Sequence, residues 1–289
     1  MKIQRKATAC ALLAAALYAI HTPLSKLLLD SIPPTMMAAF LYLGAGLGMF
    51  LAGMCRRLCG KAEKELPLTR KELPYTLLMV ILDIAAPILL MLGLRLTTAA
   101  NASLLNNFEI VATSLLALLL FREAVSKRLW LAIGLVTLAS LLLSLEDRSG
   151  LSFSYGSLFV LLACVCWGLE NNCTRRLSSQ NPLEIVVIKG FGSGLGALIV
   201  AFCAGEKLPH MGLILLAMLL GFVAYGLSIY FYIHAQRGLG AARTSTYYAV
   251  APFIGTALSL VLFRQAPSAI FLTATAIMMA GTYFASTDN

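Results

Sequence analysis

The chain has 289 residues, of which 60% are hydrophobic and 12% are charged. Soluble domains contain about 45–50% apolar and about 25% charged residues, so this composition excludes a soluble globular protein and indicates an integral membrane protein. The net charge of +9 comes from basic residues in short loops between apolar segments, so the membrane explains it and nucleic acid is not an expected partner.

Apolar segments long enough to cross a bilayer as helices need about 20 residues. In chain order, the sequence predicts ten such helices, at 7–29, 35–55, 74–94, 98–121, 128–145, 153–174, 183–203, 211–235, 240–263 and 267–286. The first segment follows three basic residues, as a signal peptide does, but it is long and has no clear Ala-rich cleavage motif. We therefore interpret it as a helix that stays in the protein.

Basic residues are distributed unevenly between the two sides of the predicted membrane protein. Sixteen Lys and Arg side chains fall on the side that holds the N-terminus and the 56–73 loop, and four fall on the other side. Because cytoplasmic loops carry the excess of Lys and Arg, both termini are expected in the cytoplasm. The predicted location is the cell membrane, with multiple passes.

The two halves of the sequence resemble each other. Residues 94–123 align with residues 236–265 at a constant offset of 142, with the identities Arg95/Arg237, Ala99/Ala241, Ala100/Ala242, Ser103/Ser245, Leu116/Leu258, Leu118/Leu260, Leu120/Leu262, Phe121/Phe263 and Arg122/Arg264. The pattern predicts two five-helix repeats, 1–148 and 149–289. An odd number of helices per repeat makes the repeats antiparallel, which is a transporter design with the substrate site at the midplane.

The segment Leu-Leu-Leu-Phe-Arg-Glu at 118–123, followed by Gly134, resembles the EamA-type branch of the drug/metabolite transporter superfamily. The second copy carries Pro252, Phe263-Arg-Gln and Gly281. The resemblance covers nearly the whole chain in size, number of spans and duplication. It implies that helices 1, 3, 4, 6, 8 and 9 surround a central cavity, with helices 5 and 10 at the periphery.

This chain departs from the family pattern at two positions. The glutamate that usually closes the motif is present as Glu123 but is replaced by Gln265 in the second half, and the usual mid-helix proline is present as Pro252 but is replaced by Ile110 in the first. These departures bring into question any glutamate-specific role in the second half.

Ionisable residues inside membrane spans cost about 2.5–3.5 kcal/mol, so they are functional candidates. In this chain they are His21, Asp83, Glu109, Glu170 and Lys189. Pro87 follows Asp83 by four residues and cannot donate an N–H to its carbonyl, so this turn offers several acceptor oxygens to a cation, a proton or an ammonium group. The alternative is an aspartate locked to a neighbouring helix.

Glu109 lies in the most polar predicted span. Asn106 and Thr113, at i−3 and i+4, share its helix face, and Asn107 widens that face. A protonatable carboxylate at this depth suits proton coupling, so Glu109 is the coupling candidate. The alternative is a structural glutamate that bonds to neighbouring helices.

A polar and aromatic stripe occurs once in each half. Its members are Trp167, Glu170, Asn171 and Thr174 in the second half and Tyr18, His21, Thr22 and Ser25 in the first. Both stripes are expected to face the cavity, and Tyr225 and Tyr248 are deep enough to join them. Lys189 is expected at the depth of Glu170, which suggests a structural or gating ion pair; the alternative is that Lys189 binds a substrate carboxylate.

No motif indicates an enzyme or a cofactor. The seven cysteines form no second cluster with metal spacing, no His pair has ligand spacing, and we find no Ser-His-acid set. No nucleotide-binding motif is visible, so the energy for transport is expected from a gradient or from exchange.

The sequence therefore predicts a secondary transporter that works by alternating access on an amino acid or a related amphoteric solute. The alternatives are a transporter of organic cations such as quaternary amines, and a membrane receptor or channel without turnover. Expected partners are the solute, the bilayer and protons, in a monomer or homodimer. The predicted substrate-binding residues are Asp83, Asn106, Asn107, Glu109, Trp167, Glu170, Asn171, Tyr225, Tyr248 and His21.

Overall fold

The structure, a computed structural model, describes residues 2–59, 66–121, 126–146, 154–177, 180–239, 244 and 247–287, and these ranges contain helices and no strands. The helices are α1 (Lys2–Ala19), α2 (His21–Leu28), α3 (Pro34–Leu58), α4 (Leu73–Leu96), α5 (Ala99–Leu105), α6 (Phe108–Phe121), α7 (Lys127–Glu146), α8 (Tyr155–Leu177), α9 (Pro182–Cys203), α10 (Met211–Gly221), the π-helix η1 (Phe222–Leu227), α11 (Ser228–Leu239), α13 (Ala251–Leu262) and α14 (Ala269–Ser286). Nine spans in this part of the chain are long and apolar enough to cross a membrane, and Ala251–Leu262 is a shorter apolar helix. The predicted all-helical membrane fold is confirmed.

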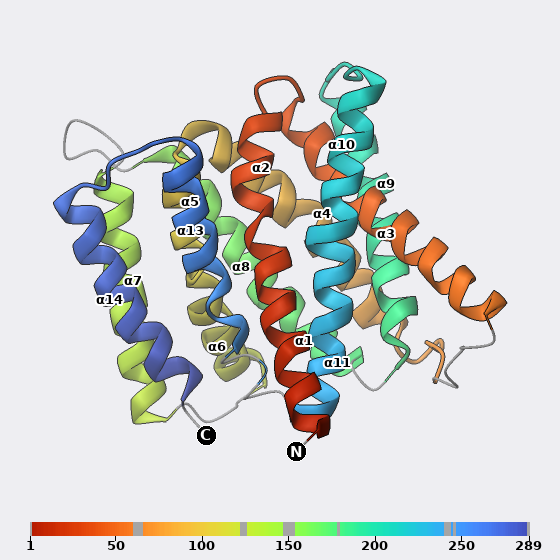
Figure 1. Cartoon of the computed structure of the whole chain (residues 1–289), viewed down its shortest axis with the longest axis horizontal. Coiled ribbons are helices and arrows are strands. Elements are labelled where there is room, and N and C mark those ends of the chain that lie inside the picture. The colour runs from red at the N-terminus through yellow and green to blue at the C-terminus, as the bar shows by residue number, and fades with distance from the viewer. Residues whose placement is uncertain are drawn as a thin grey trace.

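The two halves of the chain run in opposite directions. Both termini lie at the lower end of the molecule in Figure 1, where α1 begins. α8, the first helix of the second half, begins at the opposite end and runs back towards the termini (Figure 1). Corresponding helices are therefore antiparallel, as the odd number of spans in each half requires.

Three of the predicted spans are broken near their middle, so their prediction as continuous helices was wrong. The first span breaks at Ile20, between α1 and α2, and the fourth breaks at Asn106 and Asn107, between α5 and α6. In the ninth, α13 begins only at Ala251, after turn residues 249 and 250, whereas 240–243 and 245–246 lie outside the described residues.

Proline explains two of these breaks. Pro23 has no N–H to donate to the carbonyl of Ala19, so the first helix ends there. Pro252 sits in the first turn of α13, where the missing N–H costs nothing. The eighth span is not broken but widens into the π-helix η1, which includes Tyr225. π-helical turns of this kind are frequent at functional sites.

Glycines let α3 approach α9 and α10 closely. A Cβ atom on Gly190 of α9 would lie 2.3 Å from the Cα of Gly46 on α3, so the two backbones touch. On the other side of α3, a Cβ on Gly221 of α10 would lie 1.9 Å from the carbonyl oxygen of Leu41. Close packing of this kind drives helix association in membranes, where lipid removes the hydrophobic driving force.

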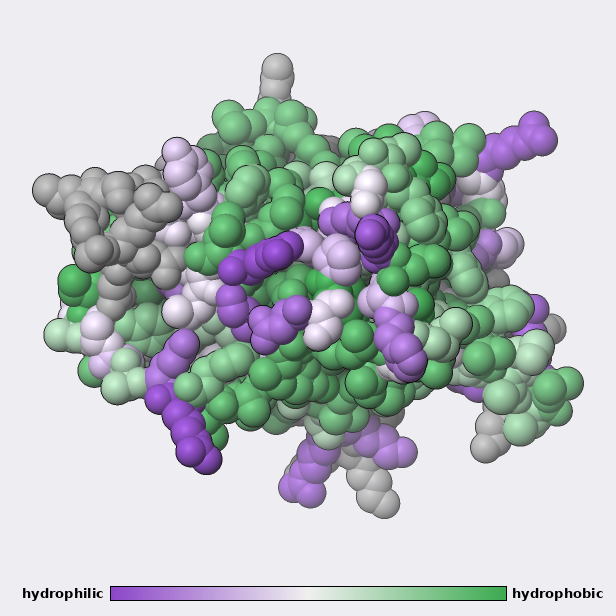
Figure 2. Space-filling view, turned by 90° about the horizontal axis from the view of Figure 1, so that it is seen from above, coloured by the Kyte–Doolittle hydropathy of each residue, from purple (hydrophilic) through white to green (hydrophobic). Residues whose placement is uncertain are grey.

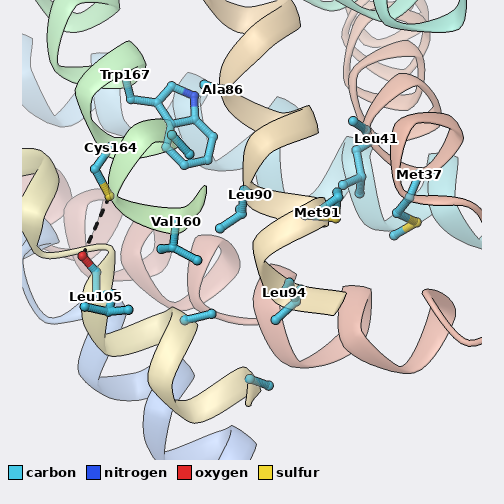
Figure 3. Packing of buried hydrophobic residues seen from close by; sticks show 14 of the residues in the cluster. Met37, Leu41, Ala86, Leu90, Met91, Leu94, Leu105, Val160, Cys164 and Trp167 are labelled. Carbon is cyan, nitrogen blue, oxygen red and sulfur yellow. Dashed lines mark hydrogen bonds between the residues drawn. The ribbon is translucent and has the colours of Figure 1, made fainter. Parts of the chain in front are cut away.

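The apolar core joins helices of both halves. Figure 3 shows side chains of α3, α4 and α8 that pack together, and the thiol of Cys164 there donates to the carbonyl of Leu105 over 3.7 Å. The labelled core residues are Met37, Leu41, Ala86, Leu90, Met91, Leu94, Leu105, Val160, Cys164 and Trp167. All seven cysteines are free thiols.

The outer surface is mostly apolar. Large side chains on several helices are exposed, among them Leu119, Leu131, Ile199 and Leu215. Seen from the end opposite to the termini, several hydrophilic side chains gather near the middle of the face, and hydrophobic ones surround them (Figure 2). A belt of exposed apolar residues around polar ends is typical of a protein that lies in a bilayer.

Candidate functional site

Three charged side chains meet where α4, α8 and α9 pack together. The Nζ atom of Lys189 lies 3.1 Å from Oδ2 of Asp83 and 3.0 Å from Oε1 of Glu170. The side chains of Asp83 and Glu170 are 0% and 3% exposed, and that of Lys189 is 10% exposed. One ammonium group therefore serves two buried carboxylates, and we call these three residues the charged triad.

Hydroxyl groups complete the shell of the triad. Tyr42 on α3 donates to Oδ1 of Asp83 over 3.0 Å, and Thr174 donates to Oε1 of Glu170. Buried charges are tolerated when they are paired and hydrogen-bonded. Each carboxylate of the triad has an ion pair and one hydroxyl donor, but Oδ2 of Asp83 has only the ion pair with Lys189 and no hydrogen-bond partner among the described residues. With all three groups ionised, the triad has one excess negative charge.

Glu109 lies apart from the triad at the start of α6 and is half-buried. The Nδ2 atom of Asn171 on α8 donates to Oε1 of Glu109 over 2.6 Å and to the hydroxyl of Thr113 over 3.3 Å. Among the described residues no basic side chain forms an ion pair with Glu109. This carboxylate is therefore held in place by a neutral amide.

An aromatic cluster contains residues from both halves. The ring of Tyr18 lies 4.4 Å from His21, 5.9 Å from Tyr225 and 5.6 Å from Tyr248, measured between centroids. Tyr225 also lies 5.3 Å from Tyr42, the residue that donates to Asp83. The hydroxyl of Tyr225 is buried and has no hydrogen-bond partner among the described residues. The cluster connects α1, α3 and η1 to the triad.

The remaining predicted site residues lie in different surroundings. Trp167 is 6% exposed and packs in the apolar core near Ala86, as Figure 3 shows. Asn106 borders a small cavity between the halves. Asn107 instead faces α14, because its Oδ1 accepts from the hydroxyl of Thr282 over 3.3 Å. Asn107 thus lies apart from the charged and aromatic groups.

Tyr42 was not predicted as a site residue. It lies in the predicted span 35–55, which has no charged side chain, so only its contact with Asp83 reveals it. Tyr18 and Thr113 were predicted to share helix faces with His21 and Glu109 but were not named among the substrate-binding residues; Tyr18 packs against His21, and Thr113 accepts from the same Asn171 amide as Glu109. No group of three or more His, Cys, Asp or Glu side chains in the part of the chain that the structure describes has the geometry of a metal site.

The antiparallel halves, with ionised and aromatic side chains buried between them, define a membrane protein built on an inverted repeat. Comparison with known families gives the same class. The EamA-like transporter family matches residues 5–145 and again residues 154–287, and the chain belongs to this family. The resemblance seen in the sequence is thereby confirmed, although Arg122 and Glu123 of its motif lie outside the described residues.

Two curated relatives are similar along much of the chain. An uncharacterized transporter of Methanothermobacter thermautotrophicus is 26% identical over 288 residues, which cover 92% of this chain and 82% of the relative. The uncharacterized transporter YyaM of Bacillus subtilis is 24% identical over 205 residues, which cover 68% of this chain and 67% of the relative. The protein is therefore a multi-pass membrane transporter by family.

A solved crystal structure has the same fold. It superposes with a TM-score of 0.67 at 19% identity, and the match covers 96% of this chain and 95% of that one. At this identity the likeness shows the fold alone. The agreement over nearly the full length supports the helix arrangement described above.

Proposed function

We propose that this protein is a secondary active transporter that carries a small polar metabolite across the cytoplasmic membrane by alternating access. Its solute is an amino acid or a related amphoteric molecule, and transport is coupled to protons or to exchange. Two antiparallel halves support this proposal, because each half is able to adopt the conformation of the other and so open the site to the opposite side.

The observation that carries the proposal is the environment of Glu109. Its carboxylate is half-buried, oriented by Asn171 and free of a basic partner among the described residues. Such a group binds either a proton or the ammonium group of a solute, and competition between the two couples their movements. Glu109 is thus the proposed coupling residue.

The charged triad has a different proposed role. Because Lys189 already contacts two carboxylates, a solute carboxylate must compete with Asp83 and Glu170 for it. An exchange of partners at Lys189 links solute binding to movement of α4, α8 and α9, which is a gating function. The proposed solute site therefore comprises Asp83, Asn106, Glu109, Trp167, Glu170, Asn171, Tyr225, Tyr248 and His21, and Asn107 supports it through its hydrogen bond with Thr282 on α14.

The engagement of Lys189 also favours a second candidate, the transport of an organic cation such as a quaternary amine. A quaternary amine has no carboxylate, so it does not need to compete for Lys189. It is attracted by the carboxylate of Glu109 and by the ring faces of the aromatic cluster. A cation carrier accepts choline-like solutes and rejects zwitterions, whereas an amino-acid carrier does the reverse.

A ligand screen on the purified protein tests the proposal. Solutes that raise the midpoint of thermal unfolding are then offered to proteoliposomes at two pH values, with and without the same solute inside. A carrier shows faster uptake when solute is present on the opposite side, and the uptake depends on pH. Uptake that is insensitive to internal solute indicates a channel and contradicts the proposal, as does the failure of every stabilising solute to cross the membrane.

A further inference from the structure

A small polar cavity lies where three broken helices meet. It is bordered by the end of α1, the start of α2, the end of α5 and the first turn of α13, so both halves contribute to it. Its space suits about one water-sized group. Glu109 and the charged triad do not border this cavity, but His21 and Asn106 of the proposed solute site do, so the two sites adjoin.

Two of its side-chain oxygens are buried without a partner. Oγ of Ser103 and Oδ1 of Asn106 have no hydrogen-bond partner in the described ranges, and the two residues are 2% and 5% exposed. Leaving such groups unsatisfied lowers stability, because each loses its hydrogen bonds to water without gaining a partner. A ligand that accepts electron pairs from both oxygens removes this cost.

A backbone carbonyl faces the same space. Pro23 removes the N–H that a continuous helix would direct at the carbonyl of Ala19. A Cβ atom on Gly255 of α13 would lie 2.9 Å from this carbonyl oxygen and 3.2 Å from Oγ of Ser103. The two oxygens therefore converge on one point, which stays open because residue 255 is glycine.

Thr22 contributes a fourth oxygen. Nδ1 of His21 lies 2.7 Å from the carbonyl oxygen of Tyr18, and Nε2 of His21 lies 3.0 Å from the hydroxyl oxygen of Thr22. The carbonyl of Tyr18 can only accept, so Nδ1 of a neutral His21 carries the proton and Nε2 accepts from Thr22, whose lone pairs remain available. His21 thereby prepares Thr22 as an acceptor.

The chemistry of these four oxygen atoms determines which ligand the cavity binds. All four groups are neutral, hard oxygen acceptors, and no carboxylate of the described residues borders the cavity. Carbonyl oxygens at interrupted membrane helices are a known means of holding monovalent cations. We infer that the cavity is a sodium-ion site formed by Ser103, Asn106, Thr22 and the carbonyl of Ala19.

Thermal unfolding of the purified full-length protein tests this site without any transport measurement, so its outcome is independent of the proposed solute. Unfolding is followed in sodium, potassium and caesium chloride at equal ionic strength. Sodium is expected to raise the midpoint by about 2–4 °C over caesium, and potassium by less, because the charge of the smaller sodium ion lies closer to the coordinating oxygens. Equal midpoints in the three salts, or equal shifts with sodium and potassium, overturn the inference and indicate a water site.

Two variants test whether the sodium-specific shift in the unfolding midpoint arises at this cavity. Ser103→Ala removes one oxygen, and Gly255→Ala fills the space where the oxygens converge. Both are expected to abolish the sodium-specific shift, and Ser103→Ala alone decides the matter if Gly255→Ala does not fold. Ser140→Ala is the matched control, because this buried hydroxyl on α7 donates only to the carbonyl of Val136. A shift of wild-type size in Ser103→Ala contradicts the assignment, as does loss of the shift in the control.

Discussion

The Nζ atom of Lys189 lies 3.0 Å from Oε1 of Glu170, and the same ammonium group lies 3.1 Å from Asp83 on a third helix. α4, α8 and α9 are thus joined through a single cation. Removal of that cation leaves two carboxylates buried side by side, whereas removal of either carboxylate leaves a pair that is still balanced.

Lys189→Met is therefore expected to lower the free energy of unfolding by about 3–5 kcal/mol, because two buried charges lose their partner. Glu170→Gln is expected to cost much less, since Asp83 still pairs with Lys189. Thermal or denaturant unfolding in detergent measures both. In a double-mutant cycle the two substitutions are expected to be strongly non-additive, and purely additive losses would show that the contact has no energetic weight.

Gly190→Ala is expected to destabilise the protein by about 1–3 kcal/mol, because the new methyl group meets the backbone of Gly46 and forces α3 away from α9. The matched control is Gly134→Ala on α7, where nothing lies within 4 Å of the new Cβ. That change is expected to be neutral or to stabilise by up to about 1 kcal/mol. Equal effects of the two substitutions on the unfolding midpoint would contradict the close approach of α3 and α9.

Asn107→Ala is expected to reduce stability by about 1–2 kcal/mol, because the hydroxyl of Thr282 loses its acceptor. KM for the transported solute is expected to stay unchanged, since Asn107 faces α14. Asn171→Ala is the comparison, because it releases Glu109 and is expected to alter KM. Uptake kinetics and unfolding measured on both variants separate the two roles. A raised KM in Asn107→Ala with unchanged stability would place Asn107 in the solute site.

Glu206, in the loop that follows α9, forms a cap on the N-terminus of α3. Its two carboxylate oxygens accept from the amides of Thr35 and Met36 over 3.2 and 2.8 Å. Glu206→Ala is expected to cost about 0.5–2 kcal/mol of stability, because it removes these bonds and a negative charge near the helix N-terminus. The neighbouring exposed Lys207→Ala should stay within about 0.5 kcal/mol of wild type. The cap is refuted if the two variants unfold at the same midpoint.

The number and order of the membrane spans follow from hydrophobicity alone, because a segment of about 20 apolar residues has few other stable positions. The duplication is readable too, since Ser103/Ser245 and their neighbours repeat at a fixed offset. The breaks within the helices were harder to predict from the sequence. Pro23 and Pro252 were visible, but a proline inside a membrane helix is often tolerated, and only neighbouring helices decide whether the chain breaks there.

The side-chain contacts within the site could also be predicted only in part from the sequence. Depth along a helix suggested that Glu170 and Lys189 lie close together, because depth follows from residue number. Depth does not give the rotation of one helix relative to another, so the contact of Asp83 with Lys189 and the bond from Tyr42 were not foreseen. The same uncertainty in rotation placed Asn107 with Asn106, although the helix break turns it towards α14.

Glu109 is the group proposed to link the movement of the solute to that of the proton. The most direct measurement is uptake of a stabilising solute into proteoliposomes with an imposed pH gradient, for wild type and Glu109→Gln. The glutamine keeps the hydrogen bond to the residue at 171 but does not titrate, so the variant is expected to bind the solute and to exchange it at equal pH, while the gradient no longer accelerates its uptake. An equal acceleration by the gradient in wild type and Glu109→Gln would contradict this central claim.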